Sequence, residues 1–240
     1  MPSFWKHVNQ VIKEADIIIE VLDARSIKET RNPEIEYKVK EKQKRLLYVI
    51  TKCDLVDIEK VKNEKIFPSV FISSRDHLGT TILKKKILEM SRGENVIVGV
   101  VGYPNVGKSS LINALSGKGS ARTSAESGYT KGLQKIKVDN KIMLLDTPGV
   151  FPHKEKDDKK HGRSGAVDFA KIKEPELAAL HLIESEINHF QKFYKIKENN
   201  PEEILRKIAI KFKLLKKGNK PDIQRAARFL LKEWQIGKMR

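Results

Sequence analysis

Apolar residues in the first half of the chain fall into short, nearly continuous runs, each followed by polar turn residues. The runs are rich in β-branched side chains and alternate with charged stretches of helical spacing. Such runs are typical of strands that are buried on both faces of a parallel sheet. The pattern predicts strands over residues 17–22, 46–50, 70–72 and 96–101. We therefore expect an α/β fold with a doubly wound sheet.

Two further segments, residues 134–138 and 141–145, are separated only by Asp139-Asn140 and predict a β-hairpin. The strand pattern ends at Pro152, and the charged stretch that follows indicates a loop. We expect one domain over residues 1–152, a mobile linker over 153–165 and a small all-α domain over 166–240.

The last third of the chain shows helical spacing only. One predicted helix has an apolar stripe of Leu177, Leu180, Ile183 and Ile187. A second opens at Asn200-Pro201-Glu202-Glu203, where an N-cap precedes a proline. It is expected to end at Gly218 and to turn Leu205, Ile208, Phe212 and Leu215 inward. A last helix carries Ile223, Ala226, Ala227, Leu230, Leu231 and Trp234.

The formal net charge of +17 favours a polyanion as the binding partner, either nucleic acid or an anionic membrane. Residues 206–240 hold twelve Lys or Arg against Asp222 and Glu233. With few aromatic residues for stacking, this tail favours structured RNA over a merely solvated basic face. The expected RNA contacts are Arg206, Lys207, Lys211, Lys216, Lys217, Arg225, Arg228 and Lys232. The single cysteine, Cys53, excludes an internal disulfide and is expected to pack rather than to react.

The predicted strand at 96–101 runs into Gly102-Tyr103-Pro104-Asn105-Val106-Gly107-Lys108-Ser109, which matches the phosphate-binding loop GxxxxGK[ST] in full. A helical segment follows it, so backbone N–H groups and a helix N-terminus converge on one anion site. Lys108 is expected to reach the β- and γ-phosphates and the Ser109 hydroxyl to ligate Mg²⁺. The expected nucleotide contacts here are Asn105, Val106, Gly107, Lys108, Ser109 and Ser110.

A second phosphate motif, Asp146-Thr147-Pro148-Gly149, follows the predicted strand at 141–145. At that position the Asp146 carboxylate can hold Mg²⁺ through water, and the Gly149 N–H can contact a γ-phosphate. Alone, the motif would be an ordinary turn. Its spacing from Lys108 makes it a partner of the phosphate-binding loop.

Two polar segments follow earlier predicted strands: Thr51-Lys52-Cys53-Asp54 and Ser73-Ser74-Arg75. A carboxylate there can accept two hydrogen bonds from the N1–H and N2–H₂ edge of guanine, which adenine lacks. The segments resemble the [NT]KxD and SA[KL] guanine-recognition motifs of the GTPase superfamily. The resemblance implies that Asp54 selects guanine, that Lys52 covers the ring and that residues 73–75 offer N–H groups to its carbonyl. Thr51 stands where Asn is commoner, and an ordinary strand-ending turn is the alternative interpretation.

The order of the motifs is unusual, because the base motifs at 51 and 73 precede the phosphate motifs at 102 and 146. Since ligands bind at the carboxyl ends of strands, a permuted chain can build the same site. The chain resembles the circularly permuted GTPases of ribosome biogenesis, the YlqF/YawG type and their nucleolar relatives. Further likenesses are Asp23-Ala24-Arg25, Arg31-Asn32-Pro33 and Gly218-Asn219-Lys220-Pro221-Asp222.

This resemblance implies a P-loop GTPase sheet in permuted order and GTP hydrolysis with Mg²⁺. The implied catalytic residues are Lys108, Thr130 and Gly149, and the implied Mg²⁺ ligands are Ser109, Thr130 and Asp146. Val150 stands where many GTPases have a glutamine that orients the attacking water. Asn105 matches an asparagine that ligates K⁺ in potassium-stimulated relatives, and that cation can replace an arginine finger. His7 is expected on the surface of the first helix.

We therefore expect a slow GTPase that assembles the large ribosomal subunit, binding precursor particles and rRNA according to its nucleotide state. We also expect a cytoplasmic monomer that does not bind membranes. Two alternatives stay open. One is an RNA-binding module that holds GTP structurally without hydrolysing it. The other is a GTPase that uses its cations on an anionic membrane surface.

Overall fold

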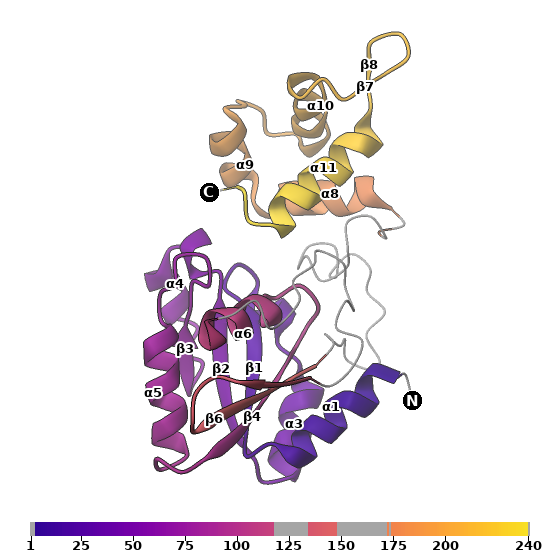
Figure 1. Cartoon of the computed structure of the whole chain (residues 1–240). Helices are drawn as coiled ribbons and strands as arrows, with labels where there is room; N and C mark the ends of the chain where they lie inside the picture. The colour runs from indigo at the N-terminus through magenta and orange to yellow at the C-terminus, as the bar shows by residue number, and fades with distance from the viewer. Residues whose placement is uncertain (1–2, 118–133, 148–171, 173, 240) are drawn as a thin grey trace. The chain divides into compact units, whose positions relative to one another are not determined.

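The computed structural model describes residues 3–117, 134–147, 172 and 174–239. The chain divides into two compact units, Met1–Glu155 and Lys156–Arg240 (Figure 1). The domain boundaries predicted at residues 152 and 165 lie outside the described residues. Within them, no helix is long and apolar enough to cross a membrane.

The first unit has the alternation of strands and helices that the apolar runs predict. Its strands are β1 (Ile17–Asp23), β2 (Arg45–Thr51), β3 (Ser69–Phe71), β4 (Val96–Gly102), β5 (Gln134–Lys137) and β6 (Ile142–Asp146). Its helices are α1 (Ser3–Glu14), α2 (Ile27–Thr30), α3 (Pro33–Glu41), η1 (Cys53–Leu55), α4 (Ile58–Lys62), α5 (Thr80–Met90) and α6 (Lys108–Ser116).

These six strands form one sheet in the order β3-β2-β1-β4-β6-β5. All neighbours pair in parallel except β5, which pairs antiparallel with β6 and confirms the predicted hairpin. The chain builds the sheet outward from β1 through β2 to β3, and then returns to place β4 on the other side of β1. The order of the strands thus reverses between β1 and β4, the kind of point at which open α/β sheets bind ligands.

Helices cover both faces of the sheet, as a doubly wound fold requires (Figure 1). On one face, α1 and α3 bury their apolar stripes against β1, β4 and β6. The buried residues of this cluster are Trp5, Val8, Val11, Ile12, Ala15, Ile18, Ile35, Val39, Val101 and Leu145. On the other face α5 and α6 pack together, with Leu83, Ile87, Leu111, Ile112 and Leu115 buried.

A buried polar link fixes the start of α3 against β1. The Asn32 side chain caps the helix by accepting from the N–H groups of Glu34 (3.1 Å) and Ile35 (3.3 Å). The Asn32 N–H donates to the carboxyl of Glu20 at 2.7 Å, and Glu20 is fully buried on β1. Burial raises the pKa of Glu20 to about 8, although the Asn32 hydrogen bond opposes the shift. Glu20 is therefore protonated at neutral pH.

The second unit is helical, as predicted, and it adds a short hairpin that the sequence pattern did not predict. Its elements are α8 (Pro175–Ser185), α9 (Ile187–Tyr194), α10 (Pro201–Lys211), β7 (Leu215–Lys216), β8 (Lys220–Pro221) and α11 (Ile223–Gln235). Its core includes Ala179, Leu182, Ile183, Phe190, Leu205, Ile208, Ala227, Leu230 and Trp234.

Three details of the predicted helices are wrong. The helix predicted to end at Gly218 ends at Lys211, so Leu215 lies in β7 and Phe212 is 40% exposed. Leu177 is 43% exposed, because the core-facing stripe of α8 is formed by Ala178, Ala179, Leu182 and Ile183. His7 on α1 is half-buried rather than a surface side chain, and its Nδ1 is enclosed without a hydrogen-bond partner.

Candidate nucleotide site and basic helical surface

The polar motifs of the first unit follow five strands whose carboxyl ends point the same way. In the register of the sheet, Asp23 is opposite Thr51, Val21 is opposite Gly102, and Val100 is opposite Asp146. The ends of β1, β2, β4 and β6 therefore meet at one edge, on both sides of the point where the strand order reverses. The fold brings together motifs that are far apart in the sequence.

The phosphate-binding loop begins where β4 passes close to β1. At Gly102 a Cβ would lie 2.6 Å from the carbonyl oxygen of Val21, and φ is +145°, so this position requires glycine. The loop ends at Lys108, the first residue of α6. Lys108 is buried, and its Nζ donates to the carbonyls of Gly102 (3.3 Å) and Tyr103 (2.6 Å). The ammonium thus links the end of the loop to its start.

Electrostatics place a carboxylate beside that lysine. Burial lowers the pKa of Lys108 to about 8, and the charge of Asp146 opposes this shift. Asp146 ends β6 and is buried, and the neighbouring Thr147 hydroxyl donates to the carbonyl of Val100 at 2.8 Å. This bond ties the acidic motif to the strand that carries the phosphate loop. The geometry suits a cation and a phosphate held between these two strands.

The residues present fit Mg²⁺ better than an all-protein metal cage. The described residues include no cluster of three or more His, Cys, Asp or Glu that could hold a metal ion. Ser109 is the second residue of α6 and Asp146 ends β6. A hydroxyl and one carboxylate are the sparse, hard donors that Mg²⁺ uses alongside water and phosphate. Thr130 and Gly149, predicted to complete this side of the site, lie outside the described residues.

The base motif Thr51-Lys52-Cys53-Asp54 is hydrogen-bonded directly to the phosphate-binding loop. The Thr51 hydroxyl lies 2.6 Å from the carbonyl of Val106 and 2.9 Å from that of Leu22. Lys52, in a left-handed conformation, donates from Nζ to the carbonyl of Asn105 at 3.0 Å. The threonine that replaces the commoner asparagine therefore still reaches the loop. The base side and the phosphate side of the site form one hydrogen-bonded unit.

Asp23, at the end of β1, organises this link, a role that the sequence analysis did not assign. It is 1% exposed and pairs with Lys52 Nζ at 2.8 Å and with Arg25 Nη2 at 2.7 Å. Burial alone would raise the pKa of Asp23, but Arg25 and Lys52 outweigh it and hold the pKa well below its usual range. The available signal was a polar Asp-Ala-Arg triplet directly after a fully apolar strand.

Asp54 is anchored to the loop that follows β3. The Ser73 hydroxyl lies 2.9 Å from Asp54 Oδ1 and 3.0 Å from Asp76 Oδ2. The loop is closed by paired backbone hydrogen bonds between Ser73 and Leu78. Ser74 is half-buried with its hydroxyl enclosed, whereas Arg75 is exposed. The two base motifs thus meet, with Asp54 and Ser73 in contact and Arg75 pointing away from the core.

Cys53 lies inside the base motif but has the surroundings of a packing residue. Its thiol donates to the carbonyl of Ile50 at 3.1 Å. Burial raises the pKa of Cys53 to about 11, so the thiol stays protonated at neutral pH. This agrees with the expectation that it packs rather than reacts.

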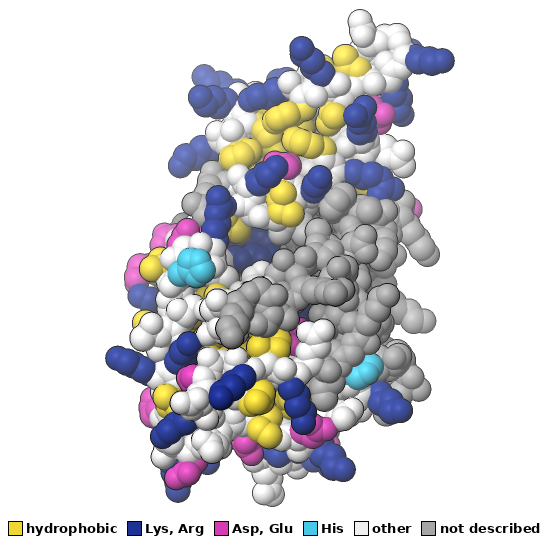
Figure 2. Space-filling view, viewed as in Figure 1, with side chains coloured by type: hydrophobic (Ala, Val, Ile, Leu, Met, Phe, Trp, Pro, Cys, Tyr) yellow, Lys and Arg dark blue, Asp and Glu magenta, His cyan; other side chains and the backbone are white. Residues whose placement is uncertain are grey.

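In the second unit, the predicted RNA contacts lie on its surface. Arg228 is half-buried, and the others are exposed: Arg206, Lys207, Lys211, Lys216, Lys217, Arg225 and Lys232. Some are held by local partners, such as Lys207 by Glu198 (3.2 Å) and Lys211 by the Tyr194 carbonyl (2.7 Å). Figure 2 shows Lys and Arg side chains around exposed apolar ones on this unit. The exposed apolar residues are Leu177, Phe193, Ile210, Phe212 and Ile236.

Comparison with known proteins assigns this arrangement to a family. Residues 97–215 match the family model described as 50S ribosome-binding GTPase. A GTP-binding protein of Methanocaldococcus jannaschii is 43% identical over 98% of this chain and 65% of its own length. Nucleolar GTP-binding protein 2 of Yarrowia lipolytica is 32% identical over 98% of this chain and 49% of its own. The chain thus spans from about half to two thirds of the length of these relatives.

Solved structures show the same fold over nearly the whole chain. A GDP-bound YlqF matches with a TM-score of 0.68 at 24% identity, covering 96% of this chain and 94% of that one. A GNP-bound YlqF from T. maritima matches with a TM-score of 0.69 at 24% identity, covering 98% and 94%. The family match begins at β4, after both base motifs, as expected for a permuted chain. Residues 97–215 therefore match the 50S ribosome-binding GTPase family, within a chain that has the circularly permuted GTPase fold of YlqF.

Proposed function

We propose that the chain binds GTP at the edge formed by β1, β2, β4 and β6 and hydrolyses it with Mg²⁺. The observation that carries this proposal is the bonding of the base motif to the phosphate loop, through Thr51 to Val106 and Lys52 to Asn105. A guanine at Asp54 and phosphates at Lys108 would then lie on one rigid frame. A GTP-specific site requires this coupling, because base and phosphates belong to a single ligand.

Each group has a distinct task in the proposed reaction. The Lys108 ammonium would neutralise charge on the β- and γ-phosphates, and Ser109 with Asp146 would hold Mg²⁺, which would neutralise further phosphate charge. Thr130 and Gly149 close over the γ-phosphate when it is present. Val150 has no hydrogen-bonding side chain to align the attacking water. Asn105 would hold K⁺, whose charge would replace that of an arginine finger, and we expect intrinsic turnover to be slow until a ribosomal particle is bound.

Base exchange gives a sharp test of the proposed site. Xanthine carries a carbonyl where guanine carries its N2 amine, and an asparagine amide can donate to that carbonyl. The Asp54→Asn protein should therefore bind GTP more weakly and XTP more tightly. We expect a change in preference of at least about 100-fold, measured by fluorescence titration with both nucleotides. Lys108→Ala, as the matched control, should weaken both nucleotides alike. Unchanged GTP preference in the Asp54→Asn protein would show that this carboxylate does not read the base.

We further propose that the nucleotide state controls binding to precursors of the large ribosomal subunit and their rRNA. Along the sequence, the segment after Asp146, at the end of β6, connects the proposed γ-phosphate motif to the basic helical unit. Ordering that segment with GTP would change how the basic surface is presented, and hydrolysis would release the particle. Sedimentation with particles should show tighter binding with a non-hydrolysable GTP analogue than with GDP. Equal affinity in the two states would contradict nucleotide control.

Two alternative functions give different outcomes in the same assays. A module that holds GTP structurally would bind GTP normally, yet show no hydrolysis even with particles and K⁺. A membrane-surface GTPase would cosediment with anionic liposomes, using Ile210 and Phe212 beside Lys211 as its exposed contacts. Most apolar residues of α10 and α11 are buried in the core of the helical unit, which supports RNA over lipid.

A further inference from the structure

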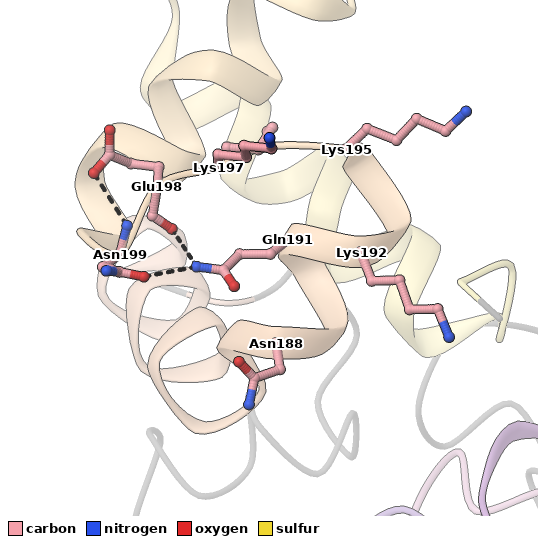
Figure 3. A pocket seen from close by; sticks show the side chains of 8 residues that line it. Asn188, Gln191, Lys192, Lys195, Lys197, Glu198 and Asn199 are labelled. Atoms are coloured by element: carbon pink, nitrogen blue, oxygen red, sulfur yellow. Dashed lines mark hydrogen bonds between the residues drawn. The ribbon is translucent and has the colours of Figure 1, made fainter.

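The helical unit has a hollow on its surface, and none of the residues that line it was given a role in nucleotide or RNA binding above. It has a volume of about 670 Å³ and is formed by one face of α9 and the segment that leads to α10. Figure 3 shows the side chains that line it, which are Asn188, Gln191, Lys192, Lys195, Ile196, Lys197, Glu198 and Asn199. Within α9, Asn188, Gln191 and Lys192 follow the i, i+3, i+4 spacing of one helix face, and Lys195 follows as the left-handed C-cap residue.

The floor of the hollow is built from neutral amides held in place. Gln191 donates from Nε2 to the Glu198 carbonyl at 2.6 Å and to Asn199 Oδ1 at 2.9 Å (Figure 3). Both amide hydrogens of Gln191 are used in this way, so its carbonyl is oriented as an acceptor. Asn188, one turn earlier on the same face, is exposed and offers both a donor and an acceptor.

The rim of the hollow is positively charged. Lys192, Lys195 and Lys197 are exposed, and Figure 3 shows Lys192 and Lys195 extending outward from the end of α9. The only carboxylate in the lining, that of Glu198, accepts from Lys207 (3.2 Å) and from the Asn199 N–H (3.0 Å). The three rim lysines are therefore not neutralised by the one acid beside them.

This chemistry excludes several ligand classes and fits one. A single carboxylate, already engaged, does not make a cation site. The lining holds no aromatic residue for base stacking, and its only apolar side chain, Ile196, is buried. Asn188, which can donate and accept, and the Gln191 carbonyl, which can accept, match a ribose hydroxyl, and the flanking ammonium groups match the phosphates on either side of it.

We propose that this hollow binds the ribose-phosphate backbone of RNA and reads the 2′-hydroxyl through Asn188 and Gln191. The proposal rests on the proposed function, in which the helical unit binds rRNA, and it adds a basis for choosing RNA over DNA. The rim lysines supply affinity for any nucleic acid backbone, whereas the amides supply discrimination.

Competition between RNA and DNA hairpins of the same sequence tests this proposal with the full chain. The unmodified protein should bind the RNA hairpin roughly tenfold more tightly. Asn188→Ala should weaken the RNA complex roughly three- to tenfold and leave the DNA complex unchanged. Lys195→Ala should weaken both complexes alike and leave the ratio unchanged. Asn63→Ala, an exposed amide on the first unit, is the matched control and should change neither.

The outcomes separate this inference from the function on which it rests. Equal affinity for RNA and DNA in the unmodified protein, or equal loss of both in Asn188→Ala, would overturn 2′-hydroxyl reading and leave RNA binding intact. Binding to neither hairpin would contradict the RNA-binding function and this inference together.

Discussion

At the scale of single residues, Asp23 is a buried carboxylate with two cationic partners. It is held between Arg25 and Lys52, and Lys52 in turn holds the phosphate loop through Asn105. Asp23→Asn removes the charge that both cations share. We expect about 3 kcal/mol lower stability in chemical unfolding, because two partly buried cations lose a fully buried counter-ion. We also expect roughly tenfold weaker GTP binding.

The control for this prediction is an ion pair that is exposed to solvent, whereas Asp23 is buried. Glu59 pairs with Lys62 at 2.8 Å on the surface, and Glu59→Ala should change stability by less than about 0.5 kcal/mol. Equal stability of the Asp23→Asn and Glu59→Ala proteins would show that Asp23 does not organise its two partners.

Glu20 predicts a pH dependence of stability. Its pKa of about 8 in the folded chain exceeds the ordinary value of 4.5, so the folded state keeps a proton that the unfolded state releases. The stabilisation is complete below about pH 4.5 and is lost as pH rises toward 8. Glu20→Gln keeps an acceptor for the Asn32 N–H without the proton. Unfolding titrations should show the substituted protein gaining a few kcal/mol relative to the original between pH 5 and pH 8.5.

A parallel pH dependence in both proteins would contradict this assignment. It would mean that other groups, and not the buried Glu20 carboxyl, set the loss of stability at alkaline pH.

At the scale of elements, the β7–β8 hairpin and the start of α11 depend on two turn residues and one cap residue. Gly218 (φ +81°) and Asn219 (φ +58°) take left-handed conformations, and Asp222 accepts from the Arg225 N–H at 3.0 Å as the N-cap of α11. This hairpin explains why α10 ends at Lys211. It also presents Lys216, Lys217 and Lys220 on a defined turn rather than on a helix.

A substitution in this turn tests the energetic cost of the left-handed backbone conformation separately from any steric clash. A Cβ at Gly218 would meet no atom within 4 Å, so Gly218→Ala adds no clash. Its cost is the left-handed φ alone, about 1 kcal/mol, and thermal unfolding should show that loss. Gly218→Asn should lose less, because Asn tolerates this conformation. Equal losses for the two substitutions would indicate that conformation is not the cause.

At the scale of the whole molecule, charge should determine how the chain responds to salt. If Lys216 and Lys217 contact RNA phosphates, their joint replacement by alanine should make the dependence of log K on log[salt] shallower by about one for each lysine. Filter binding of an rRNA fragment at several KCl concentrations measures this slope. Lys40 and Lys62, exposed on the first unit, give a control pair with the same loss of charge. An identical slope in both double variants would show that net charge, not these positions, governs binding.

Much of the fold and of the nucleotide site could be predicted from local sequence. Each parallel strand of the sheet is marked by its own apolar run, and Lys108, Ser109 and Asp146 belong to short segments whose chemistry needs only adjacent residues. The parallel sheet followed because such runs need burial on both faces. Even the permuted order was readable, because it is an order of motifs along the chain.

Tertiary structure decided the features that depend on residues distant in the sequence. The link from Thr51 to Val106 and the burial of Asp23 between Arg25 and Lys52 arise only once β1, β2 and β4 lie side by side. The end of α10 at Lys211 follows from the hairpin beyond it, since helical spacing alone continues to Phe212 and Leu215. Periodicity and motifs report the preferences of nearby residues, whereas an ion pair or a helix end is selected by the free energy of the packed whole.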